Sequence, residues 1–185
     1  MTPPRPAPLH LAAGELRLVL SRSPDLNEVP RPPLEQGKIR YPRPRGGMPL
    51  LQTPKLAAEY LIQYCTGTGE LDDPREHAYV LACNTKQRLL TDPYLLAIGA
   101  MSTCQFSVAE VYRYALAIGA SSVIVAHTHP SGDVEPSAED TQITRRVQMA
   151  GDIFGIPVLD HVILAGCHRT VESRGYFSFQ ERGLL

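Results

Sequence analysis

The sequence predicts a mixed α/β domain over residues 53–185, preceded by a proline-rich arm over residues 1–52. In the second segment, stretches with apolar residues at helical spacing alternate with extended apolar runs. They predict helices and strands in the order α-β-β-β-α-β-α-β. Eleven of the 17 prolines lie in the first 50 residues, where they remove backbone donors and oppose helices and central strands. A length of 185 residues is sufficient for one domain with its own core.

The arm and the domain also differ in charge. The first 50 residues hold eight Lys or Arg against four Asp or Glu, whereas the remainder holds ten against fifteen. The net charge of −1 argues against a uniformly basic nucleic-acid-binding protein. Within the arm, residues 15–20 could form an edge strand. The basic run RYPRPR, residues 40–45, is either a solvated linker or a contact for an acidic partner or a phosphate backbone.

The first helix is predicted to begin at Pro54, because Thr53 is a suitable N-cap and proline suits the first helical position. Gly67 and Gly69 are expected to end this helix. Three short strands separated by turns are then expected in succession, at residues 76–82, 88–90 and 95–98.

Two further helices are predicted from capping patterns at their starts, Ser107-x-x-Glu110 and Ser137-x-x-Asp140. Each is followed by a nearly continuous apolar run, which is typical of a strand buried on both faces. The remaining elements are therefore two buried strands and a terminal turn or short helix, at residues 121–126, 158–165 and 177–183.

The sequence becomes chemically specific at residues 126–140, AHTHPSGDVEPSAED. His127 and His129 are two residues apart at the end of a predicted strand, so both imidazoles point to one face. A tight turn and a helix start follow, which brings the carboxylate of Asp140 back towards them. Two histidines and a carboxylate leave a fourth tetrahedral position for water, as in catalytic zinc sites. Taken singly, a His-x-His pair or a first-turn Asp is also explained by packing or capping.

This segment resembles the JAMM signature of the MPN/JAB metalloprotease superfamily, in which His-x-His-Pro is followed by a spacer and Ser-x-x-Asp. The matching residues are His127, His129, Pro130, Ser137 and Asp140. The segment is more closely similar to the RadC branch, which carries His-Asn-His-Pro-Ser-Gly. Further blocks match in order over about residues 54–180: LACNTK, ALAIGASSVIVAH and TRRVQMAGDIFGIPVLDHVIL. The resemblance implies a JAB/MPN, cytidine-deaminase-like fold, a mixed β-sheet flanked by helices, with one Zn²⁺ per chain.

The resemblance also implies a catalytic glutamate on an early strand, and Glu76 is the matching position. Beside a zinc-bound water, Glu76 would take a proton and later deliver it to the leaving amine. Taken alone, Glu76 is more simply explained as an exposed residue at a strand start. Ser137 is a second candidate catalytic residue that could hydrogen-bond the oxyanion or the zinc-bound water, although its capping role is enough to explain it.

Other titratable residues are expected to have supporting roles. Asp160 and His161 on the last strand are predicted to orient a ligand imidazole or to support the fold. His77 faces away from Glu76 on a strand and is expected at the surface or in packing. The four cysteines show no Cys-x-x-Cys spacing and are expected to be reduced and buried.

These observations favour a zinc-dependent metallopeptidase or isopeptidase of the JAMM class that acts on a peptide or a protein conjugate. The alternative is a RadC-type protein that acts on or near nucleic acid in DNA repair. The family usually carries a helix-hairpin-helix unit ahead of the JAB domain, whereas residues 1–52 show prolines, and the acidic domain disfavours phosphate contacts. A zinc deaminase would need His-x-Glu with Pro-Cys-x-x-Cys, which the sequence lacks. The intact ligand set argues against a metal-free adaptor.

No apolar run is long enough for a transmembrane helix, and the first residues lack the basic and apolar regions of a signal peptide. We therefore expect a cytoplasmic protein without a membrane partner.

Overall fold

A computed structural model of the protein describes residues 34–35, 38–39, 49–99, 106–166 and 175–185. The strand predicted at residues 15–20 and the basic run at residues 40–45 lie outside these ranges. Within the described ranges the elements follow in the order β1 (Leu34–Glu35), β2 (Lys38–Ile39), α2 (Pro54–Thr68), β3 (His77–Cys83), β4 (Tyr94–Ile98), α3 (Val108–Ile118), β5 (Ser122–His129), α4 (Ala138–Phe154), β6 (Val158–Ala165) and β7 (Tyr176–Ser178).

Five strands form one mixed sheet in the order β4-β3-β5-β6-β7, and β1 and β2 pair separately. β3 is antiparallel to both β4 and β5, and β7 is antiparallel to β6. β5 and β6 run parallel at the centre of the order. Parallel neighbours need a crossover connection, and α4 supplies it. The observed sheet confirms the predicted α/β fold class.

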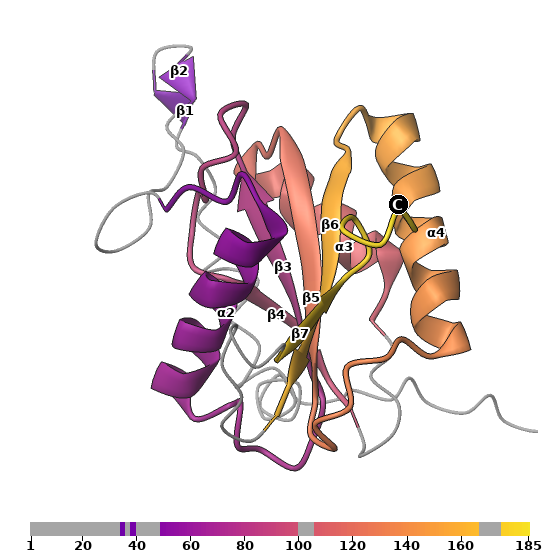
Figure 1. Ribbon diagram of the computed structural model, residues 1–185. Helices are drawn as coiled ribbons and strands as arrows, with labels where there is room; N and C mark the ends of the chain where they lie inside the picture. Colours follow the sequence, from indigo (N-terminus) through magenta and orange to yellow (C-terminus); the bar gives the residue numbers. More distant parts are fainter. Residues whose placement is uncertain (1–33, 36–37, 40–48, 100–105, 167–174) are drawn as a thin grey trace, which may run out of the picture.

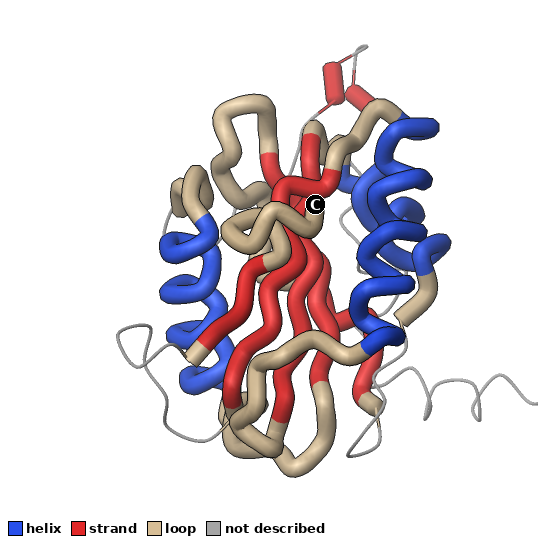
Figure 2. The backbone as a smooth tube through the Cα atoms, turned by 45° about the vertical axis from the view of Figure 1, so that its right-hand side comes forward, coloured by secondary structure: helices blue, strands red, loops and turns tan. Residues whose placement is uncertain are grey.

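The helices cover both faces of this sheet, α2 on one side and α3 with α4 on the other (Figures 1 and 2). The core beneath α3 and α4 includes Ala78 and Val125, whereas the core beneath α2 includes Tyr79 and Ile124. Successive strand residues point to opposite faces, so β3 and β5 supply both cores. This arrangement explains why the two strands are apolar along almost their whole length.

The helix ends follow the capping chemistry of the sequence. The Thr53 side chain accepts a hydrogen bond from the Leu56 N–H at 3.2 Å, and Pro54 occupies the first turn. The helix α2 continues through Gly67 and ends at Gly69, whose φ of 76° requires the left-handed conformation that glycine adopts readily. Capping therefore explains the bounds of α2 to within a residue or two.

Three local predictions differ from the structure. Residues 88–90 contribute isolated bridges rather than a strand, because the chain bends again at Leu90. Residues 177–183 were expected to form a turn or short helix, but the first of them belong to strand β7, where Phe177 is buried and the chain pairs with β6. The turn follows after the strand. Glu110, predicted to close a capping box, instead pairs with Arg113 one turn along α3.

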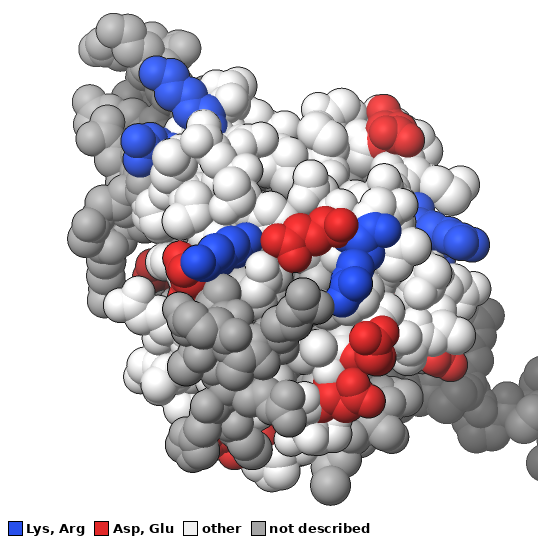
Figure 3. Space-filling model, viewed as in Figure 1, with Lys and Arg blue, Asp and Glu red and all other residues white. Residues whose placement is uncertain are grey.

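Basic side chains (Lys and Arg) and acidic side chains (Asp and Glu) are interspersed on the face of the molecule shown in Figure 3. Cys65 and Cys83 are free and buried, as predicted, while Cys104 and Cys167 lie outside the described residues. None of the helices in the described part of the chain is both long and apolar enough to cross a bilayer.

The helices α3 and α4 are in close contact at Gly151. Tyr112 of α3 donates its hydroxyl proton to the Val147 carbonyl of α4 at 2.8 Å. A Cβ at Gly151 would lie 2.6 Å from Tyr112 Oη and 2.8 Å from the Ile156 carbonyl oxygen. Gly67 in α2, by contrast, has no atom within 4 Å of its would-be Cβ. The two helical glycines therefore differ in the space available to a methyl group.

We predict that Gly151→Ala lowers the free energy of unfolding by about 1–3 kcal/mol, because the added methyl group overpacks the contact between α3 and α4. Gly67→Ala makes the same change in open space and should raise the free energy of unfolding by about 0.5–1 kcal/mol. Urea unfolding of both variants beside the wild type measures these values. Equal stabilities of the two variants would contradict the close approach at Gly151.

Candidate metal centre

The two histidines lie at the carboxyl end of β5 and on one face of the sheet. In the ladders, His127 is opposite Ala78 of β3 and Ile163 of β6. Ala78 belongs to the core beneath α3 and α4, so His127 and His129 both project to that side. The strand extends to His129, beyond the predicted end at residue 126, and this extension holds both imidazoles in register.

Asp140 reaches the histidines from the first turn of α4. Gly132, with a φ of 79°, turns the chain after β5 and donates its N–H to the His129 carbonyl at 3.0 Å. Ser137 then caps the helix, and its Oγ accepts the Asp140 N–H at 3.0 Å. In return, the N–H and hydroxyl of Ser137 donate to Asp140 Oδ2 at 2.8 and 2.6 Å. The cap that begins the helix therefore also orients the Asp140 carboxylate.

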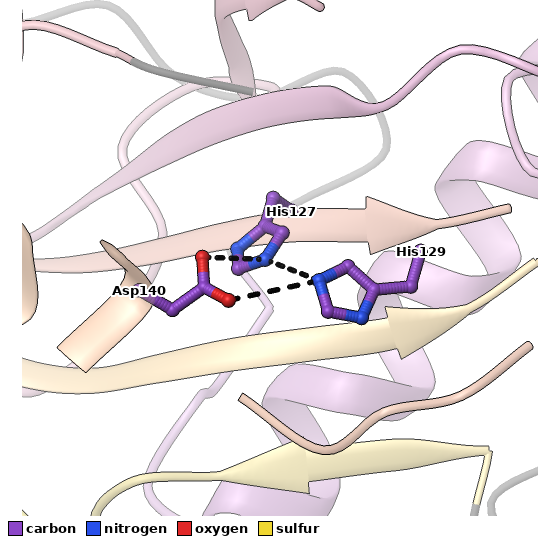
Figure 4. Close-up of side chains that lie close together, drawn as sticks. All are labelled: His127, His129 and Asp140. Carbon is purple, nitrogen blue, oxygen red and sulfur yellow. Dashed lines mark hydrogen bonds and ion pairs between the residues drawn. The ribbon is translucent and has the colours of Figure 1, made fainter. Parts of the chain in front are cut away.

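His127, His129 and Asp140 direct their side chains toward one another (Figure 4). His127 Nε2 lies 2.9 Å from His129 Nε2 and 3.2 Å from Asp140 Oδ1, and His129 Nε2 lies 3.8 Å from Asp140 Oδ2. One ligand atom from each residue fits within 4.8 Å of the others. Tetrahedral ligands bound 2.0–2.1 Å from zinc would lie about 3.3 Å apart. The three side chains could therefore hold a metal ion between them.

Hydrogen bonds set the tautomer of His129 and the charge of Asp140. His129 Nδ1 lies 2.6 Å from the Asp133 carbonyl oxygen, which can only accept, so Nδ1 carries a proton. In the neutral ring that a metal requires, His129 Nε2 would offer its lone pair to the site. Burial alone would raise the pKa of Asp140, but the hydrogen bond and charge of His127 and the hydrogen bonds of Ser137 hold it well below its usual range. An ionised carboxylate and a neutral imidazole are the forms that bind metal.

Glu76 lies immediately before β3 on the same face as the histidines. Its carbonyl accepts the Gly99 N–H at 2.8 Å, so the pairing with β4 continues through this residue. Glu76 precedes Ala78 by two residues and therefore projects to the side of His127. Only 8% of Glu76 is exposed, which contradicts its alternative reading as an exposed strand-start residue. No described residue hydrogen-bonds its carboxylate.

Thr128, between the two histidines, faces the opposite side of the sheet and is buried. Its Oγ1 accepts the His77 N–H at 2.9 Å, beyond the last ladder pair between Ala78 and His127. This bond joins the start of β3, next to Glu76, to the end of β5. His77 is buried on that opposite side, which fits the expected packing role rather than the expected surface position.

His161 lies directly behind His127 and is completely buried. Its Nε2 is 2.9 Å from Nδ1 of the candidate ligand His127, and its Nδ1 is 2.5 Å from Thr144 Oγ1. Burial, and then the neighbouring His127, lower the pKa of His161 well below its ordinary value, so the ring is neutral. The sequence motifs do not include Thr144, although its position four residues after Asp140 puts both on one helix face.

Asp160 faces the other side of the sheet from His161. Of its two expected roles, its contacts fit support of the fold and not the orientation of a histidine of the cluster. It accepts hydrogen bonds from Ser178 Oγ at 2.7 Å and from the Gln180 N–H at 3.0 Å, which hold the C-terminal turn. It also lines a cavity of about 150 Å³ beside the start of α2. Burial raises the pKa of Asp160 to about 6, and the two hydrogen bonds only partly oppose that rise.

Comparison with known proteins agrees with this geometry. A family model described as RadC-like JAB domain matches residues 51–184. Proteins named UPF0758 from Rubrobacter xylanophilus, Chlorobium chlorochromatii and Thermotoga maritima are 44%, 38% and 40% identical to this chain over 111, 130 and 125 residues. The alignments cover 60%, 70% and 68% of this chain, and 45%, 54% and 52% of those relatives. The chain thus spans about half the length of the curated relatives it matches.

We predict that Asp160 makes the protein less stable as the pH rises from about 4 to about 6. The pKa of this carboxyl is about 6 in the fold, whereas it is about 3.9 in an unfolded chain. Between these values the folded state binds more protons, so rising pH favours unfolding. A shift of this size corresponds to about 3 kcal/mol, and Asp160→Asn should abolish the dependence.

Urea unfolding of the wild type and Asp160→Asn at intervals from pH 4 to 8 measures this effect. The stability of the wild type relative to the variant should fall until about pH 6 and then level off. Asp152→Asn removes an exposed carboxylate from α4 and is the matched control. A constant difference between wild type and Asp160→Asn would show that the buried carboxyl does not titrate in this range.

Proposed function

The chain belongs to the RadC-like JAB domain family, and we propose that it is a zinc-dependent hydrolase of the JAMM class that cleaves an amide bond in a peptide or protein conjugate. The observation that carries the proposal is the convergence of His127, His129 and Asp140 at the carboxyl end of β5. Glu76 lies on the same face of the sheet, at the position that the family resemblance assigns to a catalytic glutamate.

Zinc suits this donor set because two imidazole nitrogens and one carboxylate leave room for water and substrate. His127 and His129 would hold the ion through Nε2, and Asp140 would hold it through its carboxylate. When bound, zinc polarises a carbonyl group and lowers the pKa of a water molecule towards neutrality. The single carboxylate among the ligands leaves the ion with a net positive charge, which is the condition for that polarisation.

Glu76 would move the protons of the reaction. Its carboxylate would accept a proton from the attacking water. It would then donate that proton to the nitrogen of the leaving amine, so that water adds across the amide bond with no net gain of protons. Ser137 would act first through Asp140, which it orients with two hydrogen bonds. Its predicted contact with the oxyanion would require the hydroxyl to leave the cap.

We predict that Asp140→Asn and Glu76→Gln separate metal binding from catalysis. Asp140→Asn removes the anionic ligand and should weaken zinc binding, measured by metal analysis after dialysis. Glu76→Gln should retain zinc but lower the rate of cleavage by about 10²-fold or more, because the amide cannot accept the proton. The rates come from a zinc-dependent cleavage screen against amide-linked conjugates.

Glu139→Gln is the matched control for both variants, because Glu139 is an exposed carboxylate in the same turn of α4 as Asp140. It should retain zinc and full activity. A wild-type protein that binds no zinc would overturn the proposal, as would undiminished cleavage by Glu76→Gln.

The nucleic-acid alternative depends on the basic arm, and we expect it to fail in a direct assay. DNA contacts through Lys and Arg weaken steeply between 50 and 200 mM salt, by orders of magnitude when several phosphates are neutralised. Fluorescence anisotropy with labelled duplex DNA should show no such salt-dependent binding by the full chain. Binding that is present at low salt, and is lost when Arg40, Arg43 and Arg45 are changed to Ala, would instead support the DNA-repair role.

A further inference from the structure

A chain of hydrogen bonds joins two of the three candidate metal ligands behind the site. His127 Nδ1 lies 2.9 Å from His161 Nε2, and His161 Nδ1 lies 2.5 Å from Thr144 Oγ1. Thr144 Oγ1 in turn lies 2.5 Å from the backbone oxygen of Asp140. The other side of the same imidazole faces the carboxylate, with His127 Nε2 3.2 Å from Asp140 Oδ1.

The carbonyl at one end sets the direction of every bond in this chain. A carbonyl oxygen only accepts, so the Thr144 hydroxyl donates its single proton to Asp140 and must accept from His161 Nδ1. A neutral His161 then has its lone pair on Nε2, which accepts the proton on His127 Nδ1. In the neutral His127 ring that metal binding requires, Nε2 then carries the lone pair, and it faces Asp140 and His129. This tautomer is the one that can bind a metal through Nε2.

Burial and ring packing hold the chain in place. His161 is 0% exposed, Thr144 1% and His127 2%, so water does not compete for their hydrogen bonds. The His161 ring stacks on Phe179 with 4.9 Å between centroids and 10° between planes. It also contacts Phe106 edge to face, with 6.2 Å between centroids. These aromatic contacts fix the plane of the ring, and with it the directions of both ring nitrogens.

We infer that Thr144 and His161 form a positioning relay that fixes the tautomer of His127 and ties it to the turn of α4 that carries Asp140. The inference rests on the proposed zinc site, since the relay holds two of its ligands in register. An imidazole that exchanged tautomers would carry a proton on Nε2 part of the time and lose its ligand atom. Outer-shell partners of this kind typically contribute about 10–100-fold to metal affinity.

Thr144→Val tests the relay with little change of volume, because a methyl group replaces the hydroxyl. Competition with a chromophoric chelator should show that the full chain with this change binds Zn²⁺ about tenfold more weakly or worse. Thr144→Ser restores the hydroxyl and should return the affinity to that of the wild type. Thr141→Val is the matched control, since Thr141 donates to the Ser137 carbonyl at 3.2 Å in the same way but makes no bond to His161.

A second measurement needs no metal. Nitrogen-15 NMR of the histidine rings in the metal-free protein, above the pH range of histidine titration, should find His161 and His127 protonated on Nδ1. Thr144→Val removes the acceptor of the His161 proton and should move protons to Nε2 in both rings, at least in part. Thr141→Val should leave both tautomers unchanged.

The two measurements keep the relay and the proposed function apart. A wild type without Zn²⁺ affinity overturns the proposed function, while the tautomers still decide whether the relay exists. A wild type that binds Zn²⁺ supports the relay if Thr144→Val shifts both the affinity and the tautomers. If either stays at its wild-type value in that variant, the relay is overturned.

Discussion

The parallel pairing of β5 with β6 is the constraint on which the candidate site depends. Parallel neighbours cannot be joined by a tight turn, so the chain must cross over through α4 and return to the start of β6. The first turn of α4 consequently follows the end of β5, where two alternate residues already point to one face. One glycine turn and one serine cap are then sufficient to bring Asp140 to His127 and His129. The three candidate ligands thus come from a stretch of 14 residues.

The hydrogen bonds of this cluster differ from those of a catalytic triad. In a triad, a serine hydroxyl donates to a histidine, and the far side of that histidine donates to a carboxylate. Here the hydroxyl of Ser137 donates to Asp140, and His129 Nδ1 lies against the Asp133 carbonyl outside the cluster. The Ser137 hydroxyl is therefore directed to a carboxylate rather than to a histidine, which does not fit a serine nucleophile.

The parts of the site that could be predicted from sequence are those set by local periodicity. Strand alternation places His127 and His129 together, and helix capping places Ser137 and Asp140. Glu76 could be assigned only through the family resemblance, because nothing local relates residue 76 to residue 129; the antiparallel register of β3 and β5 does so. The contact between Thr144 and His161 likewise depends on how α4 packs on β6. The same holds for the fold. Capping residues and apolar runs predicted the helices and the central strands, whereas β7 is a strand because it pairs with β6, which the local sequence does not indicate.

Strand alternation alone predicts that Asp160 and His161 point to opposite faces of the sheet, because the two residues are consecutive in β6. What the sequence does not specify is which face of β6 meets the ligands of β5. That choice comes from the parallel register, in which His161 is opposite Val125, a residue on the same side as His127.

The hydrogen bond between Thr128 and His77 gives the middle residue of His-x-His a chemical requirement of its own. Its side chain must be short and must accept a hydrogen bond, because it replaces a ladder bond where β3 and β5 begin to part. Threonine and asparagine both satisfy this condition, whereas valine would match the shape of threonine and leave the buried His77 N–H unpaired. Residue 128, the unspecified x of the His-x-His motif, is therefore restricted in this protein by the hydrogen bond that it makes on the opposite face of β5.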